Sequence, residues 1–226
     1  MKKISDDTIL ILSGIPCVGK TSVAYKIIQQ YPDFRRVSEM DMVRTIIRAV
    51  LNNLINDSIL AEDIIKQEYS DLFETLTVSD LNTTKLQAQK LMPYVKEIIL
   101  RQQRRKIPSI IEGSGIIPSL FFPNGTPVEW LNSNIIFVNL YISDDNEQKK
   151  RRHTRYIERK YTSDYSEIEK REAVVMSEKN CELHTETVNL GKKFPNVFSI
   201  DTSYISLEEI AAEIIDIVKS CFSNKS

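Results

Sequence analysis

The chain has 226 residues, a length that suits one sizeable α/β domain with room for an inserted helical cap. Hydrophobic residues make up 42% and charged residues 27%, as in ordinary globular proteins, and the net charge of −1 argues against a nucleic-acid or membrane partner. Three scattered cysteines and two histidines argue against a disulfide framework and a structural zinc site, and no signal peptide or membrane-length apolar run is present, so we expect a cytoplasmic protein.

The first predicted strand, residues 9–12, leads into a phosphate-binding loop. Residues 14–21 fit the pattern G-x-x-x-x-G-K-[ST] without a mismatch, and a helix-compatible segment, residues 21–30, follows. Gly14 and Gly19 lack a Cβ, so the chain can fold closely round a phosphate chain with its amide groups turned inward. The helix adds the positive end of its dipole. The stretch therefore predicts a nucleotide-phosphate site.

The same motif assigns roles to individual side chains. We expect Lys20 to reach the β- and γ-phosphates of the nucleotide and the Thr21 hydroxyl to ligate Mg²⁺. The other loop residues predicted to contact the nucleotide are Gly14, Cys17, Val18, Gly19 and Ser22. Cys17 is interpreted as a tolerated variable position of the loop rather than as a redox group.

Four more short apolar runs alternate with helical patterns along the rest of the chain. The predicted strands are residues 34–38, 108–113, 134–142 and 196–200. The predicted helices are residues 41–54, 94–105 with Pro93 at or near the start, 144–160, 166–193 and 207–221, with a mixed helical stretch at 56–81 and a loop at 114–127. This alternation predicts a parallel sheet covered by helices on both faces, with ligands gathered at the carboxyl ends of the strands.

Two acidic residues follow predicted strands and should reach that edge. Asp41 comes after the second strand, where it could deprotonate or hold a substrate hydroxyl for attack on the γ-phosphate, or simply cap the next helix. Glu112 ends the third strand, where an acid would hold Mg²⁺ or its waters. Gly113 and Gly115 indicate close backbone approach to a ligand. Glu39 is the weaker candidate, because strand alternation turns it away from the crevice.

Arginines supply the remaining predicted contacts with anions. Arg44 lies one helical turn after Asp41 and could clamp an anionic group of the substrate, or remain a solvated helix charge. The helix at 144–160 carries Arg151, Arg152, Arg155 and Arg159. The last three recur at spacings of three and four on one face and could cover the transferring phosphoryl group as a lid, with Arg155 and Arg159 the chosen pair. A solvated basic helix and an RNA-binding patch are the alternatives.

Together these segments resemble the 2-phosphoglycerate kinase-like P-loop kinases of the adenylate-kinase-like group. The matching segments are residues 14–21, 38–44, 110–113 and 152–159. The resemblance implies a three-layer P-loop NTPase sandwich with strand order 2-3-1-4-5, Mg-ATP as donor and a small phosphorylated or hydroxylated acceptor. It also implies the roles given above for Lys20, Thr21, Asp41, Arg44, Glu112, Arg155 and Arg159. The stretches 56–81 and 114–127 are individual to this chain, so the acceptor need not be 2-phosphoglycerate.

The sequence thus predicts one domain, residues 1–226, with a helical substrate-side region at 42–106 and a lid at 144–165. The expected activity is transfer of the γ-phosphate of ATP, with Mg²⁺, to a hydroxyl of a small molecule. The absence of an Asn-Lys-x-Asp motif favours ATP over GTP, and residues 201–204 could contribute to the adenine pocket. A nucleic-acid or nucleotide kinase, a kinase acting on a sugar nucleotide or antibiotic, and a non-catalytic or switch-like ATP-binding protein are the alternatives. A homodimer is possible.

Overall fold

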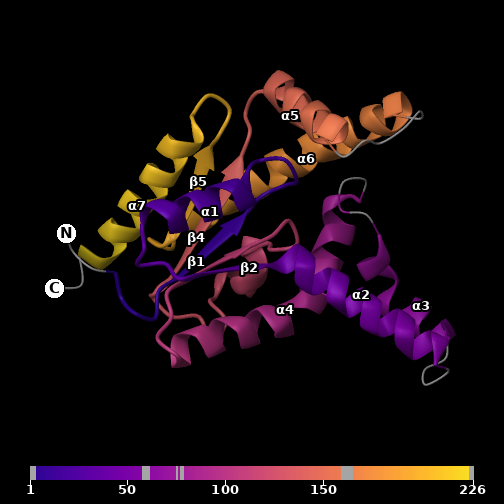
Figure 1. The fold of residues 1–226 in the computed structure, drawn as a ribbon, viewed down its shortest axis with the longest axis horizontal. Coiled ribbons are helices and arrows are strands. Elements are labelled where there is room, and N and C mark those ends of the chain that lie inside the picture. Colours follow the sequence, from indigo (N-terminus) through magenta and orange to yellow (C-terminus); the bar gives the residue numbers. More distant parts are fainter. Residues whose placement is uncertain (1–3, 58–61, 75, 77–78, 159–164, 224–226) are drawn as a thin grey trace.

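Five parallel strands form one sheet in the order β2-β3-β1-β4-β5. The structure is a computed structural model, drawn in Figure 1, that describes residues 4–57, 62–74, 76, 79–158 and 165–223. The strands are β1 (Ile9–Ser13), β2 (Arg36–Glu39), β3 (Ser109–Glu112), β4 (Ile135–Tyr141) and β5 (Val197–Asp201). The predicted fold class and strand order are confirmed. Leu12 pairs in register with Glu112, and Glu112 with Glu39, so the carboxyl ends of three neighbouring strands meet at one edge.

The side chains of the central strand, β1, point alternately to the two faces of the sheet, and this explains why helices cover both faces. Leu10 and Leu12 belong to a buried cluster that includes residues of α1 (Lys20–Gln30) and α7 (Leu207–Ser223), two helices that lie side by side in Figure 1. Ile9 and Ile11 point the other way, into a cluster with Val95 and Ile99 of α4 (Leu81–Arg104). A strand buried on both faces needs a continuous run of apolar residues, which β1 has from Ile9 to Leu12.

Pro93 does not begin a helix, contrary to the prediction. Helix α4 starts twelve residues earlier, at Leu81, where the Asp80 side chain accepts a hydrogen bond from the Thr83 amide as an N-cap. Proline inside a helix removes one main-chain hydrogen bond and costs about 3 kcal/mol. Burial of Leu91 and Val95 on either side of Pro93 offsets that cost, so packing overrides the local signal.

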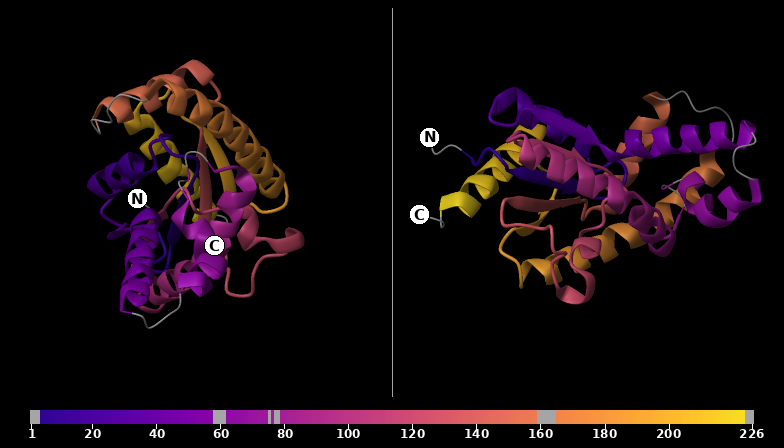
Figure 2. Two further views of the ribbon diagram at one scale, coloured as in Figure 1. Left: turned by 90° about the vertical axis from the view of Figure 1, so that its right-hand side faces the viewer. Right: turned by 90° about the horizontal axis from the view of Figure 1, so that it is seen from below.

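Two helical regions extend beyond the carboxyl edge of the sheet. One contains α2 (Met40–Asn56), α3 (Glu62–Phe73) and the first half of α4, and it closes around a small apolar cluster of Leu51, Leu72 and Leu91. The other contains α5 (Asp145–Glu158) and the start of α6 (Tyr165–Gly191), whose later part packs against β4 and β5. Figure 2 shows both regions at the same end of the molecule, away from the termini.

The rest of the chain completes the layers. Residues 114–127, predicted as a loop, contain two short 3-10 helices, η1 (Pro118–Phe121) and η2 (Pro123–Gly125), which place Phe121 and Phe122 against Phe137 of β4. None of the three cysteines, all of which lie in the described part of the chain, forms a disulfide bond. Among the described residues, no helix has the length and apolar character that crossing a membrane requires.

A buried lysine joins the two projecting helical regions. Lys179 of α6 is 2% exposed, and its ammonium group donates hydrogen bonds to the main-chain carbonyls of Leu76 and Ser79 and to the Thr84 hydroxyl. Burial lowers the pKa of Lys179 from 10.5 to about 8. The amine therefore connects α6 to the chain between α3 and α4 at a cost in desolvation.

That lowered pKa predicts an unusual dependence of stability on pH. Between pH 8 and 10.5 the unfolded chain binds the Lys179 proton and the folded chain does not, so the free energy of unfolding should rise with pH across this window. Relative to a Lys179→Met variant, the wild type should gain up to about 3 kcal/mol. Urea melts of both proteins at pH 7.5 and 10 measure the difference. Lys192→Met, which removes an exposed lysine, is the control, and parallel curves for wild type and Lys179→Met would contradict the prediction.

Candidate active site

The phosphate loop leaves the end of β1 with a backbone that few other sequences could adopt. Gly14 and Gly19 have φ angles of 134° and 96°, and Cys17 has a φ of 72°, in the left-handed region. A Cβ on Gly14 would lie 2.3 Å from the carbonyl oxygen of Leu140, so only glycine lets the loop lie this close to β4. Val18 is fully buried and packs in the core, so only its main chain could face a ligand.

Lys20 is the first residue of α1 and lies under the loop rather than in solvent. Its Nζ donates hydrogen bonds to the Ile15 carbonyl, at 2.8 Å, and to the Ser114 hydroxyl, at 3.0 Å. Burial lowers the pKa of Lys20, and the charges of Glu112 and Asp41 oppose that shift. A buried ammonium group that keeps one of its three N–H donors available is suited to meet an anion.

Thr21 and Glu112 form the pair expected to hold a metal ion. The Thr21 hydroxyl donates a hydrogen bond to Glu112 Oε1 at 2.8 Å, while the other carboxylate oxygen, Oε2, is buried without a hydrogen-bond partner. Burial raises the pKa of Glu112, against the opposing charge of Lys20. A buried carboxylate oxygen without a partner, beside a hydroxyl oxygen, is a donor set that fits Mg²⁺. No cluster of three His, Cys, Asp or Glu side chains occurs in the described chain, so other ligands would come from water and substrate.

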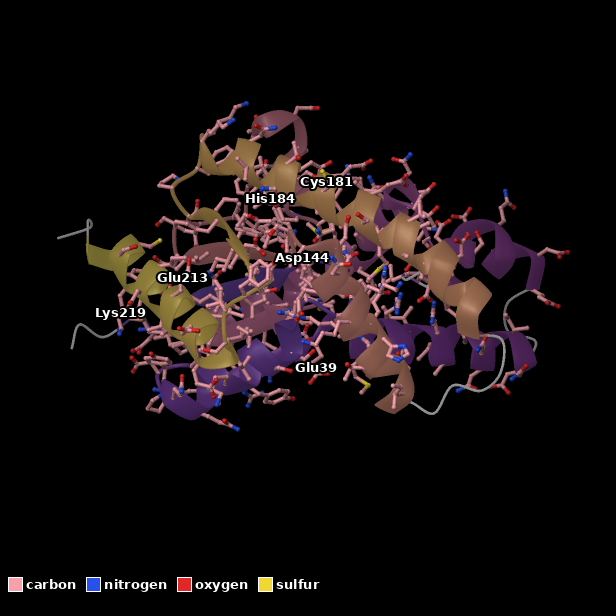
Figure 3. The ribbon with its side chains drawn as sticks, turned by 90° about the horizontal axis from the view of Figure 1, so that it is seen from above. Glu39, Asp144, Cys181, His184, Glu213 and Lys219 are labelled. Carbon is pink, nitrogen blue, oxygen red and sulfur yellow. The ribbon has the colours of Figure 1, made fainter. Side chains whose placement is uncertain are left out.

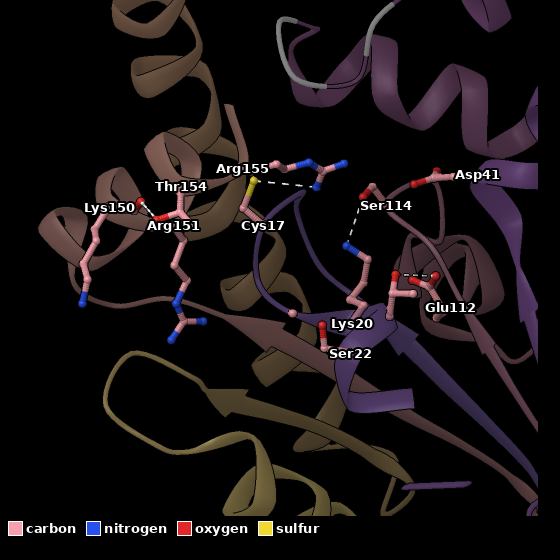
Figure 4. A pocket seen from close by; sticks show the side chains of 12 residues that line it. Cys17, Lys20, Ser22, Asp41, Glu112, Ser114, Lys150, Arg151, Thr154 and Arg155 are labelled. Carbon is pink, nitrogen blue, oxygen red and sulfur yellow. Dashed lines mark hydrogen bonds between the residues drawn. The ribbon is translucent and has the colours of Figure 1, made fainter. Parts of the chain in front are cut away.

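A cavity of about 500 Å³ brings these groups together with residues from two other parts of the chain, the start of α2 and the helix α5. Its lining consists of Cys17, Gly19, Lys20, Thr21, Ser22, Asp41, Glu112, Ser114, Lys150, Arg151, Thr154 and Arg155. Figure 4 shows the phosphate loop between the α5 side chains and Asp41, with Ser114 close to Lys20. The two acids predicted from the strand ends therefore lie in the same cavity as the predicted phosphate lysine.

Helix α5 reaches the cavity through Arg151 and Arg155. Arg155 Nη1 lies 3.7 Å from Cys17 Sγ of the phosphate loop. Arg151 donates to both the hydroxyl and the carbonyl of Thr202, after β5, and pairs with Glu147 at 2.9 Å. The helix is thus fixed both to the phosphate loop and to the end of the last strand.

The prediction that Arg152, Arg155 and Arg159 share one functional face of α5 is wrong for Arg152. Arg152 does not share the cavity with Arg155: it is 3% exposed, and its guanidinium faces the Glu172 carbonyl of α6 at 3.5 Å. Arg151, one residue earlier and four before Arg155, takes that place, because α6 packs on the face that Arg152 occupies. Arg159, the other predicted lid arginine, lies outside the described residues.

Two further predicted substrate residues do not line the cavity. Arg44 donates a hydrogen bond from Nη1 to Gln87 of α4 at 3.1 Å, and burial lowers its pKa. Gly113 is needed for packing: a Cβ there would lie 2.8 Å from the Cβ of Met40, so the glycine lets α2 approach β3. Glu39, labelled in Figure 3, accepts a hydrogen bond from Tyr25 at 2.7 Å and stays outside the lining. Strand alternation is not the reason, because Glu39 pairs in register with Glu112 and therefore lies on the same face of the sheet.

The segment after β5 contacts the phosphate loop through its side chains. The Thr202 hydroxyl lies 3.5 Å from the Val18 carbonyl, and the Tyr204 hydroxyl, on an exposed ring, donates to the carboxylate of Asp144. Figure 3 labels Asp144 just before α5. A role for residues 201–204 in holding adenine stays a prediction.

Ser114 and Arg151 are lining residues that sequence reasoning missed. Ser114 follows Glu112-Gly113 directly and lies two residues beyond the end of β3. Its position in the sequence therefore indicates that it lies at the same edge of the sheet as Glu112. Arg151 belongs to the same basic helix as Arg155 and is four residues away, which is one helical turn. Choosing Arg151 over Arg152 requires knowing which face α6 covers.

Comparisons with solved structures show the fold. A gluconokinase from Sinorhizobium meliloti 1021 superposes with a TM-score of 0.53 at 13% identity, over 97% of this chain and 96% of that one. A shikimate kinase from Acinetobacter baumannii, in complex with shikimate, gives a TM-score of 0.46 at 14% identity, over 94% of this chain and 93% of that one. No family model matches the sequence, and no curated protein sequence matches it.

Proposed function

We propose that this protein is a kinase that transfers the γ-phosphoryl group of ATP to a hydroxyl group of a small-molecule acceptor. One observation carries the proposal: the ammonium group of a phosphate-loop lysine, a threonine–glutamate pair and the carboxylate of Asp41 share one cavity. A nucleotide-binding protein without transfer chemistry needs the first two features but has no use for Asp41. The fold shared with a gluconokinase supports the same class of activity.

We assign the binding of the phosphate donor, ATP with Mg²⁺, to the phosphate loop, Glu112 and α5. The loop amides and Lys20 would hold the phosphates, and Thr21 and Glu112 would hold Mg²⁺, which supplies charge neutralisation at the β- and γ-phosphates. Arg155, whose guanidinium lies next to Cys17 of the loop, would balance the charge that spreads over the transferring group. Arg159 stays a predicted partner of Arg155 in this role. Gly14, Gly19 and the main chain of Val18 shape the loop.

We assign the activation of the acceptor hydroxyl to Asp41. Its position at the start of α2, across the cavity from the loop, suits a carboxylate that accepts the proton of an acceptor hydroxyl or orients that hydroxyl for in-line attack. Arg44 is proposed to contact an anionic group of the acceptor through the guanidinium N–H groups that its Nη1 hydrogen bond to Gln87 leaves available. Likeness to 2-phosphoglycerate kinase stays a hypothesis about the acceptor, as do a homodimer and a cytoplasmic location.

Incubation with γ-labelled ATP, Mg²⁺ and a metabolite extract tests the proposal. Mass spectrometry should find label on a small hydroxylated compound, and the Lys20→Ala variant should label that compound about 100-fold to 1,000-fold more slowly. Parallel incubations with oligonucleotides and with nucleoside monophosphates cover the alternative kinases. Label found only on nucleic acid, or ATP bound and hydrolysed with no labelled acceptor in any mixture, would contradict the proposal.

Replacement of Glu112 by glutamine should weaken the binding of Mg²⁺ without unfolding the protein. The amide keeps the size of the side chain but loses the negative charge that burial disfavours, so thermal stability should hold or rise. The Mg²⁺ concentration for half-maximal binding of a fluorescent ATP analogue should rise about 10-fold to 100-fold. Glu208→Gln, which changes an exposed acid on α7, is the control. Unchanged Mg²⁺ dependence would exclude Glu112 as a ligand.

A further inference from the structure

Ser114 lies where the phosphate loop meets the end of β3, in a turn that holds it from both sides. The Gly113 amide donates to the Leu12 carbonyl of β1 at 3.3 Å, and the Ile116 amide donates back to the Gly113 carbonyl at 3.3 Å. Ile116 and Ile117, just beyond the turn, are fully buried. The serine side chain is therefore fixed by main-chain contacts and core packing rather than free to turn with a surface loop.

The Ser114 hydroxyl is one of two acceptors that hold the Lys20 ammonium group. The other acceptor, the Ile15 carbonyl, belongs to the same loop as Lys20, so it keeps the amine near the loop whatever happens elsewhere. Ser114 lies two residues after Glu112, which is the last residue of β3. Its hydrogen bond therefore fixes the amine relative to the acid that is proposed to hold the metal.

Ser114 also lies on the acceptor side of the lysine. It lines the same cavity as Asp41, and Figure 4 shows its side chain on the side of Lys20 toward Asp41. Serine is only 6% exposed here, so its hydroxyl is shielded from bulk water and its hydrogen bond to a charged donor is strong. An amine held from this side points between the loop and Asp41.

We infer that Ser114 is a positioning residue for phosphoryl transfer: its hydroxyl holds Lys20 Nζ on the acceptor-facing side of the phosphate loop. The inference rests on the proposed kinase function and adds a residue to it. The Ile15 carbonyl suffices to keep the lysine beside bound phosphates. The Ser114 contact instead sets the direction from which the amine approaches the transferring phosphoryl group. Loss of the hydroxyl should therefore affect the transfer step more than ATP binding.

Steady-state kinetics of Ser114→Ala and Ser114→Thr test the inference. Ser114→Ala should lower kcat about 10-fold to 100-fold, the range expected for a hydrogen bond to a charged group, with KM for ATP changed less than about threefold. Ser114→Thr keeps the hydroxyl and should retain kcat to within about threefold of wild type. A purely structural serine would produce neither the split between kcat and KM nor the rescue by threonine.

Ser109→Ala is the matched control. Ser109 is a buried serine at the other end of β3, where its hydroxyl donates to the Ile107 carbonyl at 2.8 Å, and it is remote from the cavity lining. Thermal melts of the serine variants check that they are folded to the same extent. Equal kcat for Ser114→Ala and Ser109→Ala, or a parallel loss of ATP affinity and kcat in Ser114→Ala, would overturn the positioning role while wild-type activity keeps the kinase proposal. A wild type that transfers phosphate to no acceptor would overturn both.

Discussion

Replacing Lys20 by alanine is expected to lower phosphoryl transfer by about 100-fold to 1,000-fold, because the variant loses a preorganised charge at the phosphates in a site shielded from water. The fold should survive. Burial already disfavours the charged amine, as its lowered pKa indicates, so removing it should leave the melting temperature unchanged or raise it. Transfer assays and thermal melts of the same preparation measure both effects.

Lys26→Ala provides the matched control for that experiment. Lys26 lies on the same helix, α1, and pairs with the exposed Glu208 at 2.6 Å, outside the cavity lining. Its loss should change neither transfer nor, by more than about 1 kcal/mol, the free energy of unfolding. Normal turnover in Lys20→Ala would contradict the assignment of the loop as the donor site.

The change Asp41→Asn should separate acceptor chemistry from nucleotide binding. The amide keeps the shape of the side chain but cannot accept a proton, so transfer should fall about 100-fold to 10,000-fold. Affinity for ATP with Mg²⁺ should stay within about threefold, because the phosphate contacts come from the loop and from α1. Titration with a fluorescent ATP analogue and a transfer assay measure the two quantities separately.

Asp57→Asn, at the far end of the same helix, controls for the loss of one acidic charge. This variant should behave as wild type in both assays, since Asp57 is exposed and lies outside the cavity lining. Simultaneous loss of ATP·Mg²⁺ binding and transfer in Asp41→Asn would instead make Asp41 a metal ligand. Unchanged transfer would remove Asp41 from the acceptor chemistry.

The donor side of the site could be predicted from the sequence because its geometry is local. Eight consecutive residues define the loop, and the backbone conformations that Gly14 and Gly19 allow follow from their missing Cβ atoms. The strand order required the resemblance to known P-loop kinases, but the meeting of Asp41 and Glu112 with Lys20 followed from parallel strands ending at one edge.

The features that sequence reasoning missed depend on packing between distant segments. Arg151 rather than Arg152 lines the cavity because α6, which begins after α5, covers the face of α5 that carries Arg152. The retention of Pro93 inside α4 depends on the buried neighbours that surround it. The need for glycine at position 113 comes from Met40, more than seventy residues earlier. None of these contacts has a signal at short range along the chain.

The sheet order separates the two halves of the proposed reaction within the fold. The phosphate loop and Glu112 follow the interior strands β1 and β3, whereas Asp41 follows β2, a short and only partly buried strand at the border of the sheet. Substitutions in α3 and in the part of α2 after Met40 and Asp41 can therefore accumulate with little effect on the strands that carry the nucleotide site. Divergence in substrate preference among descendants of this chain should accordingly concentrate in residues 42–74, while the machinery for the phosphate donor stays fixed.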